Sequence, residues 1–369
     1  MCPPSCFHWW RELGVAASRR DFLKGALAAP LVAAGCATKR GADLTAGRAV
    51  LDDVLSVDLH AHPALFQTYS STTIDEHARA VAAGKVGAVF LAAIGDGPAL
   101  SIRSDGGPYA ARQPDPGALF ASVWRQLDVL DDHARVLGMR PALRADDLAA
   151  AATARARAAI MAVEGCDFLE GRLENVQKVY DRGVRSLQLV HYRVNELGDV
   201  QTERPLHGGL TPFGHDVIRE MNRLGILIDL AHAPLSVVTG AVDASQRPMI
   251  VSHTNIQDYT GYSRFVTPEH ARLVARHGGV LGAWPISIRP AGFDTFIEHI
   301  KRMVDVVNID HVAIGTDMSG ISPRNALFTS YTEWPTIPAA LLDRGFGRGD
   351  VAKIMSDNAR RVLEATLTG

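Results

Sequence analysis

Eight short apolar runs recur along this chain and alternate with segments of helical character. Several runs are rich in Val, Ile and Leu without polar alternation, which is typical of parallel strands covered by helices. We predict strands at 54–60, 86–93, 158–163, 184–190, 226–231, 248–252, 279–284 and 311–316. Eight strand–helix pairs match an α/β fold, the (β/α)8 TIM barrel, which takes about 250 residues plus insertions.

The segments between the runs carry helix signals. Thr211 and Thr267 each precede a proline, which places an N-cap directly before the first helical turn. We predict helices at 118–137, 169–181, 212–224 and 293–307, another beginning at 268, and extra helices packed outside the barrel at 337–367.

Composition limits the class of protein. Of 369 residues, 47% are hydrophobic and 21% are charged, which fits a globular protein with a large core. The formal net charge is -2 and no Lys/Arg cluster is present, so nothing indicates nucleic acid binding. We therefore expect one large barrel domain at 46–369 behind an N-terminal extension.

Residues 1–45 read as an export signal and linker. Ser18-Arg19-Arg20-Asp21-Phe22-Leu23-Lys24 resembles a twin-arginine signal. The apolar stretch 25–35 that follows is too short for a permanent membrane span. The sequence thus predicts an exported protein that acts in the periplasm.

Cys36 leaves open whether the exported protein is anchored to the membrane. Ala33-Ala34-Gly35-Cys36 resembles a lipoprotein cleavage site, although leucine is usual three places before the cysteine. Either Cys36 is lipidated and anchors the protein to the membrane, or the signal is cleaved and the protein released. Only Cys36 and Cys166 would remain after cleavage, so no disulfide framework is implied.

Polar side chains follow many of the apolar runs. The first run, VLSVDLHAH, ends in His60-Ala61-His62, whose imidazoles project to the same side because they are two residues apart on a strand. The corresponding residues of later strands are Glu164, His191, His232, His253 and Asp317. Each one alone could be a helix cap, a core histidine or a turn residue. Together they predict a metal site at the carboxyl ends of the strands, where TIM barrels carry their active sites.

The same segments resemble the membrane (renal) dipeptidase family of the amidohydrolase superfamily. The likeness covers about residues 52–365 and rests on the segments VDLHAHP, AVEGCDFL, LVHYRVNELGD, LTPFGHDVIREMNRLGILIDLAHAP, VSHTN and HVAIGTDMSG. The resemblance implies a barrel with two zinc ions that hydrolyses dipeptides through a metal-activated water. Some members act on D-residues, β-lactam rings or cysteinyl conjugates, and members often form homodimers.

The resemblance also implies a role for each site residue. His60 and His62 would bind the first metal, Glu164 would bridge both metals, and His232 and His253 would bind the second. His191 would contact the scissile carbonyl oxygen, Arg264 would hold the substrate carboxylate, and Asp317 would handle the proton.

His62 departs from the family pattern, which has His-x-Asp on the first strand. An imidazole replaces a carboxylate, so the first metal loses one negative charge from its ligands. Two metals are implied if His62 binds, as in the His-x-His of other amidohydrolases, and one if it turns away.

Other functions stay open at this point. One is a different amidohydrolase that acts on a lactam, a cyclic amide or a modified peptide. Such enzymes often carry a carboxylated lysine on the fourth strand, and 184–191 contains no lysine. Another is a non-hydrolytic peptide-maturation protein with the same pocket. A third is a non-catalytic metal-binding envelope lipoprotein, which would need neither Asp317, His191 nor Arg264.

Overall fold

The computed structural model describes residues 43–63, 73–104, 107–257, 261–288, 292–322 and 324–367. The predicted export signal, including Arg19, Arg20 and Cys36, lies outside these ranges. The first described element is helix α3 (Leu44–Asp53). No helix within the described ranges has both the length and the apolar character needed to cross a bilayer.

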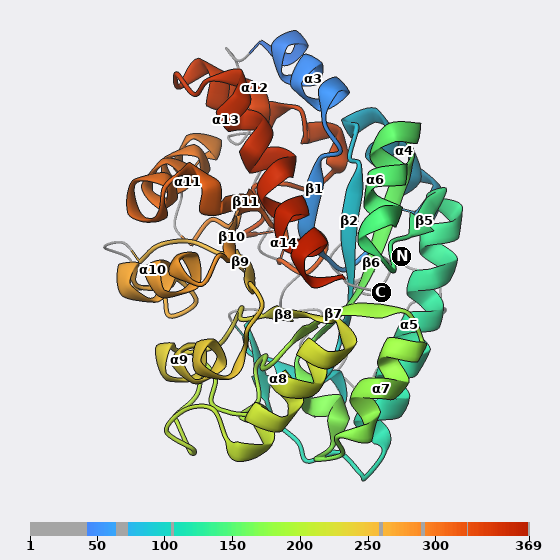
Figure 1. Ribbon diagram of the computed structural model, residues 1–369, viewed down its shortest axis with the longest axis vertical. Coiled ribbons are helices and arrows are strands. Elements are labelled where there is room, and N and C mark those ends of the chain that lie inside the picture. The colour runs from blue at the N-terminus through green and yellow to red at the C-terminus, as the bar shows by residue number, and fades with distance from the viewer. Residues whose placement is uncertain are drawn as a thin grey trace.

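All eight predicted strands are present, and they form one parallel sheet that curls into a nearly closed barrel. Figure 1 shows the strands at the centre of the molecule with helices around them. In sheet order the barrel strands are β1 (Val57–Ala61), β2 (Ala88–Ile94), β6 (Arg157–Glu164), β7 (Val184–Gln188), β8 (Leu227–Asp229), β9 (Ile250–Thr254), β10 (Val280–Ala283) and β11 (Val312–Ile314). The TIM-barrel prediction is confirmed.

The first and last strands meet just beyond their carboxyl ends. The backbone N–H of Asp317 donates to the carbonyl oxygen of His60 at 2.9 Å, and that of His62 donates to Met318 at 2.8 Å. Below them, the buried Asp58 carboxylate accepts from the backbone N–H of Thr316 at 2.8 Å. Barrel closure therefore fixes the backbone of His60 to that of Asp317 and the backbone of His62 to that of the residue after Asp317.

Helices fill the connections between the strands. They are α4 (Ile74–Gly84), α5 (Ala118–Val136), α6 (Ala145–Ala154), α7 (Glu174–Asp181), α8 (Pro212–Leu224), α9 (Leu235–Ala244), α10 (Pro268–Arg276) and α11 (Phe293–Val307). Further helices follow the last strand: α12 (Thr336–Asp343), α13 (Arg348–Ala352) and α14 (Asn358–Thr366). Three short strands were not foreseen: β3 (Leu100–Ile102) and β4 (Pro108–Ala110) form a hairpin, and β5 (Met139–Pro141) pairs with β6.

The two predicted N-caps are confirmed, but the predicted start of one helix is wrong. Thr211 accepts a hydrogen bond from the backbone of Gly214, and Thr267 accepts one from His270. The helix predicted at 169–181 begins only at Glu174. Glu170 and Gly171 have φ values of 50° and 70°, and this left-handed backbone cannot continue a right-handed helix.

The last helix occupies a different place from the one expected. Val362 and Leu363 of α14 pack in one buried cluster with residues from seven of the barrel strands, such as Val57, Ile250 and Val280. These strands form the wall of the barrel on nearly all sides, so the cluster that they share fills the barrel interior. Val57, Ile250 and Val280 are the first residues of their strands, so helix α14 covers the end where the strands begin rather than the side of the barrel. Figure 1 shows it lying across the central strands. The opposite end of the barrel remains for the site.

Candidate active site

The predicted site residues converge at the carboxyl ends of the barrel strands. Glu164 is the last residue of β6, His60 lies near the end of β1, and His253 lies near the end of β9. His191, His232 and Asp317 each follow a strand by three residues. All of these side chains are buried, with Asp317 the most exposed at 8%.

Two groups of potential metal ligands share the carboxylate of Glu164. The first group contains His60 and His62, and the second contains His232 and His253. Within each group the nitrogen and oxygen atoms lie within 4.8 Å of one another. A carboxylate has two oxygens and can therefore serve both groups at once.

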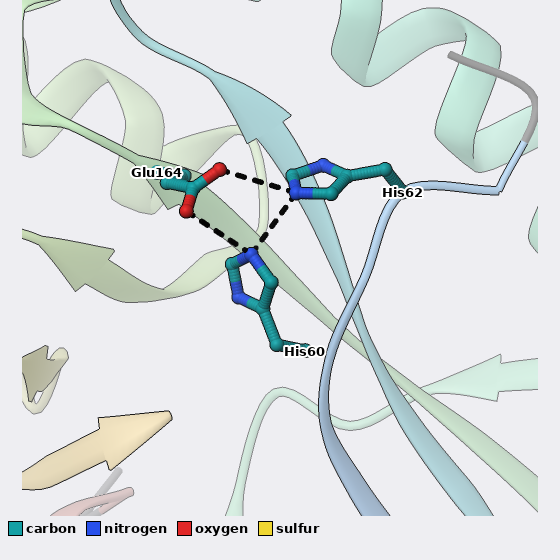
Figure 2. Close-up of side chains that lie close together, drawn as sticks. All are labelled: His60, His62 and Glu164. Atoms are coloured by element: carbon teal, nitrogen blue, oxygen red, sulfur yellow. Dashed lines mark hydrogen bonds and ion pairs between the residues drawn. The ribbon is translucent and has the colours of Figure 1, made fainter. Parts of the chain in front are cut away.

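The first group is shown in Figure 2, where both imidazoles direct Nε2 toward Glu164. His60 Nε2 lies 3.4 Å from Oε1 of Glu164, and His62 Nε2 lies 3.1 Å from Oε2. The two Nε2 atoms are 3.0 Å apart. His62 thus turns toward the site and does not swing away from it.

The second group has a similar arrangement. His232 Nε2 lies 3.2 Å from Oε1 of Glu164, and His253 Nε2 lies 3.6 Å from the same oxygen. The two Nε2 atoms are 3.3 Å apart. His232 has a φ of 66°, a left-handed conformation that is uncommon outside glycine and concentrates at functional sites.

Hydrogen bonds fix which ring nitrogen of His62 and His253 faces the groups. His62 Nδ1 donates to the carbonyl oxygen of Ala92 at 2.8 Å, because a carbonyl can only accept. His253 Nε2 accepts from Arg264 Nη2 at 3.0 Å, because a guanidinium can only donate. In their neutral forms both rings therefore carry a lone pair on Nε2, close to the Glu164 carboxylate. The His253 lone pair accepts from Arg264 and would exchange that hydrogen bond for a bound metal.

This donor set fits a divalent cation. Lone pairs that face a carboxylate at hydrogen-bond distance need a proton or a cation between them. Burial and the Arg264 guanidinium hold the pKa of His232 well below its usual value, and burial does the same for His253. Neutral imidazole is the form that binds metals, and a nitrogen–carboxylate set suits zinc.

His60 behaves differently from the other histidines. Burial lowers its pKa, but the charge and hydrogen bond of Glu164, together with the charges of Asp317 and Asp229, outweigh burial and raise the pKa to about 9. Burial opposes ionisation of Glu164, while His191 and His60 keep its pKa well below the usual range. The site thus holds a carboxylate charge that positive neighbours compensate.

His191 is held by an acid that the sequence analysis missed. Its Nδ1 lies 2.7 Å from Oδ1 of Asp96, whose other oxygen accepts from the backbone of Tyr192 at 3.1 Å. His191 Nε2 then lies 3.3 Å from Oε2 of Glu164. Asp96 follows β2 by two residues, so the rule that found the other site residues would also have found it.

Asp317 stands beside the first group. Its Oδ1 lies 3.4 Å from His62 Nε2, and its backbone has a φ of 52°. Burial raises the pKa of this carboxyl to about 6, against the opposing effect of His62 and His60. Gly320 makes room for both side chains: a Cβ there would lie 2.0 Å from Asp317 Oδ1 and 2.6 Å from His62 Cδ2.

Arg264 reaches the second group from the loop between β9 and α10. Its guanidinium is buried and lies 5.4 Å from the ring centroid of Trp284. Its Nη1 donates to the side-chain oxygen of Gln201, a contact with no signal in the sequence. Trp284 belongs to a small apolar cluster that also contains Phe265 and Ile286, so one wall beside the guanidinium is hydrophobic.

Comparison with known proteins places this architecture in a family. The family model described as membrane dipeptidase (peptidase family M19) matches residues 45–368. Dipeptidase tcpJ of Claviceps purpurea is 31% identical over 257 residues, which is 67% of this chain and 60% of that protein. The chain thus spans less than two thirds of the length of this curated relative.

Solved structures show the same fold. A metallopeptidase from Rhodobacter sphaeroides, liganded with a phosphinate mimic of the dipeptide L-Ala-D-Ala, is 19% identical with a TM-score of 0.75. That match covers 85% of this chain and 100% of the other. The probable dipeptidase PvdM from Pseudomonas aeruginosa is 19% identical with a TM-score of 0.73, covering 88% and 98% of the two chains.

The family model spans nearly all of the described barrel, including every residue of both ligand groups. The resemblance seen in the sequence is therefore confirmed. The chain belongs to the membrane dipeptidase family, peptidase family M19.

Proposed function

We propose that this protein is a zinc-dependent dipeptidase that hydrolyses the peptide bond of dipeptides. The observation that carries the proposal is the pair of ligand groups joined by Glu164. Family membership and the dipeptidase names of the curated relatives support it. Zinc is the cation we favour because imidazole nitrogen and carboxylate oxygen are its usual ligands in hydrolases.

His60, His62 and Glu164 would hold the first metal, and Glu164, His232 and His253 would hold the second. Metal ions in such a site lower the pKa of a water molecule and polarise a carbonyl group. The protein contributes the orientation of the ligands. The Ala92 carbonyl directs His62, and Glu164 places the two groups next to each other.

Asp317 is suited to accept a proton from the attacking water and to return it to the leaving amine. It lies beside the first group, and a carboxyl with a pKa of about 6 can carry the proton near neutral pH. His191 faces the same groups through Nε2. There it can contact the scissile carbonyl oxygen, where a single oxyanion donor contributes about 3–4 kcal/mol to catalysis.

Arg264 accounts for a preference for dipeptides. A guanidinium donates two parallel hydrogen bonds to a carboxylate and discriminates by charge as well as by shape. Because Arg264 touches His253, a carboxylate held there lies close to the scissile bond. This geometry selects substrates whose free C-terminus is one residue from the cleaved bond.

The proposal is tested by amino acid release from a panel of L,L- and L,D-dipeptides. The protein is first stripped with a chelator and then reloaded with Zn²⁺. We expect activity only after reloading, with tripeptides and N-acetylated amino acid amides cleaved poorly. A zinc-loaded protein that cleaves none of the dipeptides would refute the proposed activity.

We also propose that the protein is exported through its twin-arginine segment and acts in the periplasm. The support is the order of Arg19, Arg20 and the apolar stretch that follows. Replacement of both arginines by lysine should leave the protein in the cytoplasm. Cys36→Ala tests the membrane anchor: a lipidated wild type would fractionate with membranes and the variant with the soluble periplasm, whereas a cleaved and released protein would be soluble in both forms. Light scattering of the released protein tests the expected homodimer.

A further inference from the structure

Arg264 is a buried cation whose hydrogen-bond partners are neutral. Its side chain is 1% exposed, and its donors reach the Gln201 amide oxygen and His253 Nε2. Its Nε atom is buried and has no hydrogen-bond partner among the described residues. None of the ion pairs found within the described ranges involves Arg264. A buried guanidinium with neutral partners keeps its full charge for an incoming anion.

Gln201 is fixed in place by its own backbone. Its N–H donates to the carbonyl oxygen of His232 at 2.9 Å, which ties the residue to the loop that carries a predicted metal ligand. From this position the amide oxygen accepts a hydrogen bond from Arg264 Nη1. Nη2 now donates to His253 Nε2, but a metal bound by His253 would take that lone pair. With Nη1 occupied by Gln201, Nε and Nη2 would then form the edge of the guanidinium that matches the two oxygens of a carboxylate.

We propose that Gln201 is a positioning residue that orients Arg264 and keeps the guanidinium charge available for the substrate carboxylate. A glutamate of the same shape would accept the same hydrogen bond but would neutralise the charge. The neutrality of residue 201 is therefore what lets Arg264 prefer an anionic C-terminus. This inference rests on the proposed dipeptidase function, and specifically on Arg264 as the group that holds the carboxylate.

The test compares Gln201→Glu and Gln201→Met in the full-length, zinc-loaded protein. Gln201→Glu keeps the hydrogen bond and removes the net charge, whereas Gln201→Met removes the hydrogen bond and keeps the charge. The matched control is Gln177→Glu. Gln177 accepts from Arg223 at 2.9 Å on the surface, so the same charge change is made at another Arg–Gln pair.

The first readout is calorimetric binding of a phosphinate analogue of Ala-Ala, with either a free carboxylate or a carboxamide. Gln201→Glu should weaken binding of the acid by at least about tenfold and leave the amide within about threefold of wild type. Gln201→Met should weaken binding of the acid by about two- to tenfold. The control should match wild type with both ligands.

The second readout is the division between KM and kcat on a dipeptide. We expect a raised KM with little change in kcat, because Gln201 acts on binding of the carboxylate rather than on the reacting atoms. Equal loss of acid and amide binding in Gln201→Glu would overturn the inference. A ratio of acid to amide affinity that matches wild type in both variants would overturn it as well. A wild type that binds acid and amide equally would overturn it too. Failure of the proposed function shows separately, as wild type that binds the acid but cleaves no dipeptide.

Discussion

His62 Nδ1 lies 2.8 Å from the carbonyl oxygen of Ala92, so strand β2 orients a ring that follows strand β1. The contact leaves the His62 Nε2 lone pair directed at Glu164. Histidine at this position departs from the family's usual aspartate, yet it reaches the same group. The departure would thus remove one negative charge from the first group of potential ligands and keep a nitrogen that could bind a metal.

Replacement of His62 should therefore affect the first metal alone. We expect His62→Ala to lose the first metal and keep the second, because His232 and His253 are untouched. His62→Asp, which restores the family residue, should keep both metals. Elemental analysis after dialysis measures the metal content. Loss of no metal in His62→Ala would show that His62 is not a ligand.

Arg264→Ala should raise KM for dipeptides by about tenfold to a hundredfold, the effect of losing charge-assisted hydrogen bonds. Cleavage of the corresponding dipeptide amide should change little, since that substrate has no carboxylate. Arg223→Ala is the surface control. Equal loss on acid and amide would argue against carboxylate binding.

Asp96→Asn should lower kcat by at least about tenfold through misorientation of His191. Both oxygens of Asp96 accept hydrogen bonds, from His191 and from the backbone of Tyr192. An asparagine amide would place its NH2 against one of these donors, at a cost of about 1–3 kcal/mol in stability. Steady-state kinetics together with urea unfolding would separate the two effects. An unchanged kcat would show that Asp96 does not orient His191 for catalysis.

Stability should fall in mild acid because of two buried histidines outside the site. Burial lowers the pKa of His77 to about 3 and that of His133 to about 4. Their Nδ1 and Nε2 atoms, 2.8 Å apart, share one hydrogen bond between α4 and α5. In the unfolded chain such groups titrate near pH ~6.5, so below that pH the unfolded state binds more protons.

The free energy of unfolding is then fully retained above pH ~6.5 and decreases as the pH falls toward ~4. The slope per buried histidine is up to about 1.4 kcal/mol per pH unit. Urea unfolding between neutral and mildly acidic pH measures it, with His133→Gln as the comparison. This variant should show a shallower decline, and an identical decline would assign the acid sensitivity to other groups.

The sequence was sufficient for the barrel because strands and helices leave local signals. Uninterrupted Val, Ile and Leu runs mark buried strands, and the Thr-Pro pairs mark two helix starts that the structure confirms. The late start of α7 was missed because two consecutive left-handed residues, one of them glutamate, have no strong signature. The position of α14 depends on the open end of the barrel, which is a property of the whole fold.

The site residues, too, could be predicted from the sequence only in part. His60, Glu164 and His253 could be placed because each ends an apolar run, and Asp96 could have been found in the same way. Gln201 and the Ala92 carbonyl could not. Gln201 lies in a long loop and is brought to the site by a backbone hydrogen bond to His232, and a backbone carbonyl has no residue identity to read.

The central claim is that Glu164 joins two metal sites, and crystals of the zinc-loaded protein test it most directly. We expect an anomalous difference map at the zinc edge to show two peaks, each about 2.0–2.2 Å from Glu164 and its pair of histidines. One peak should lie at His60 and His62, and the other at His232 and His253. Zinc bound elsewhere, or no peak beside Glu164, would contradict the account.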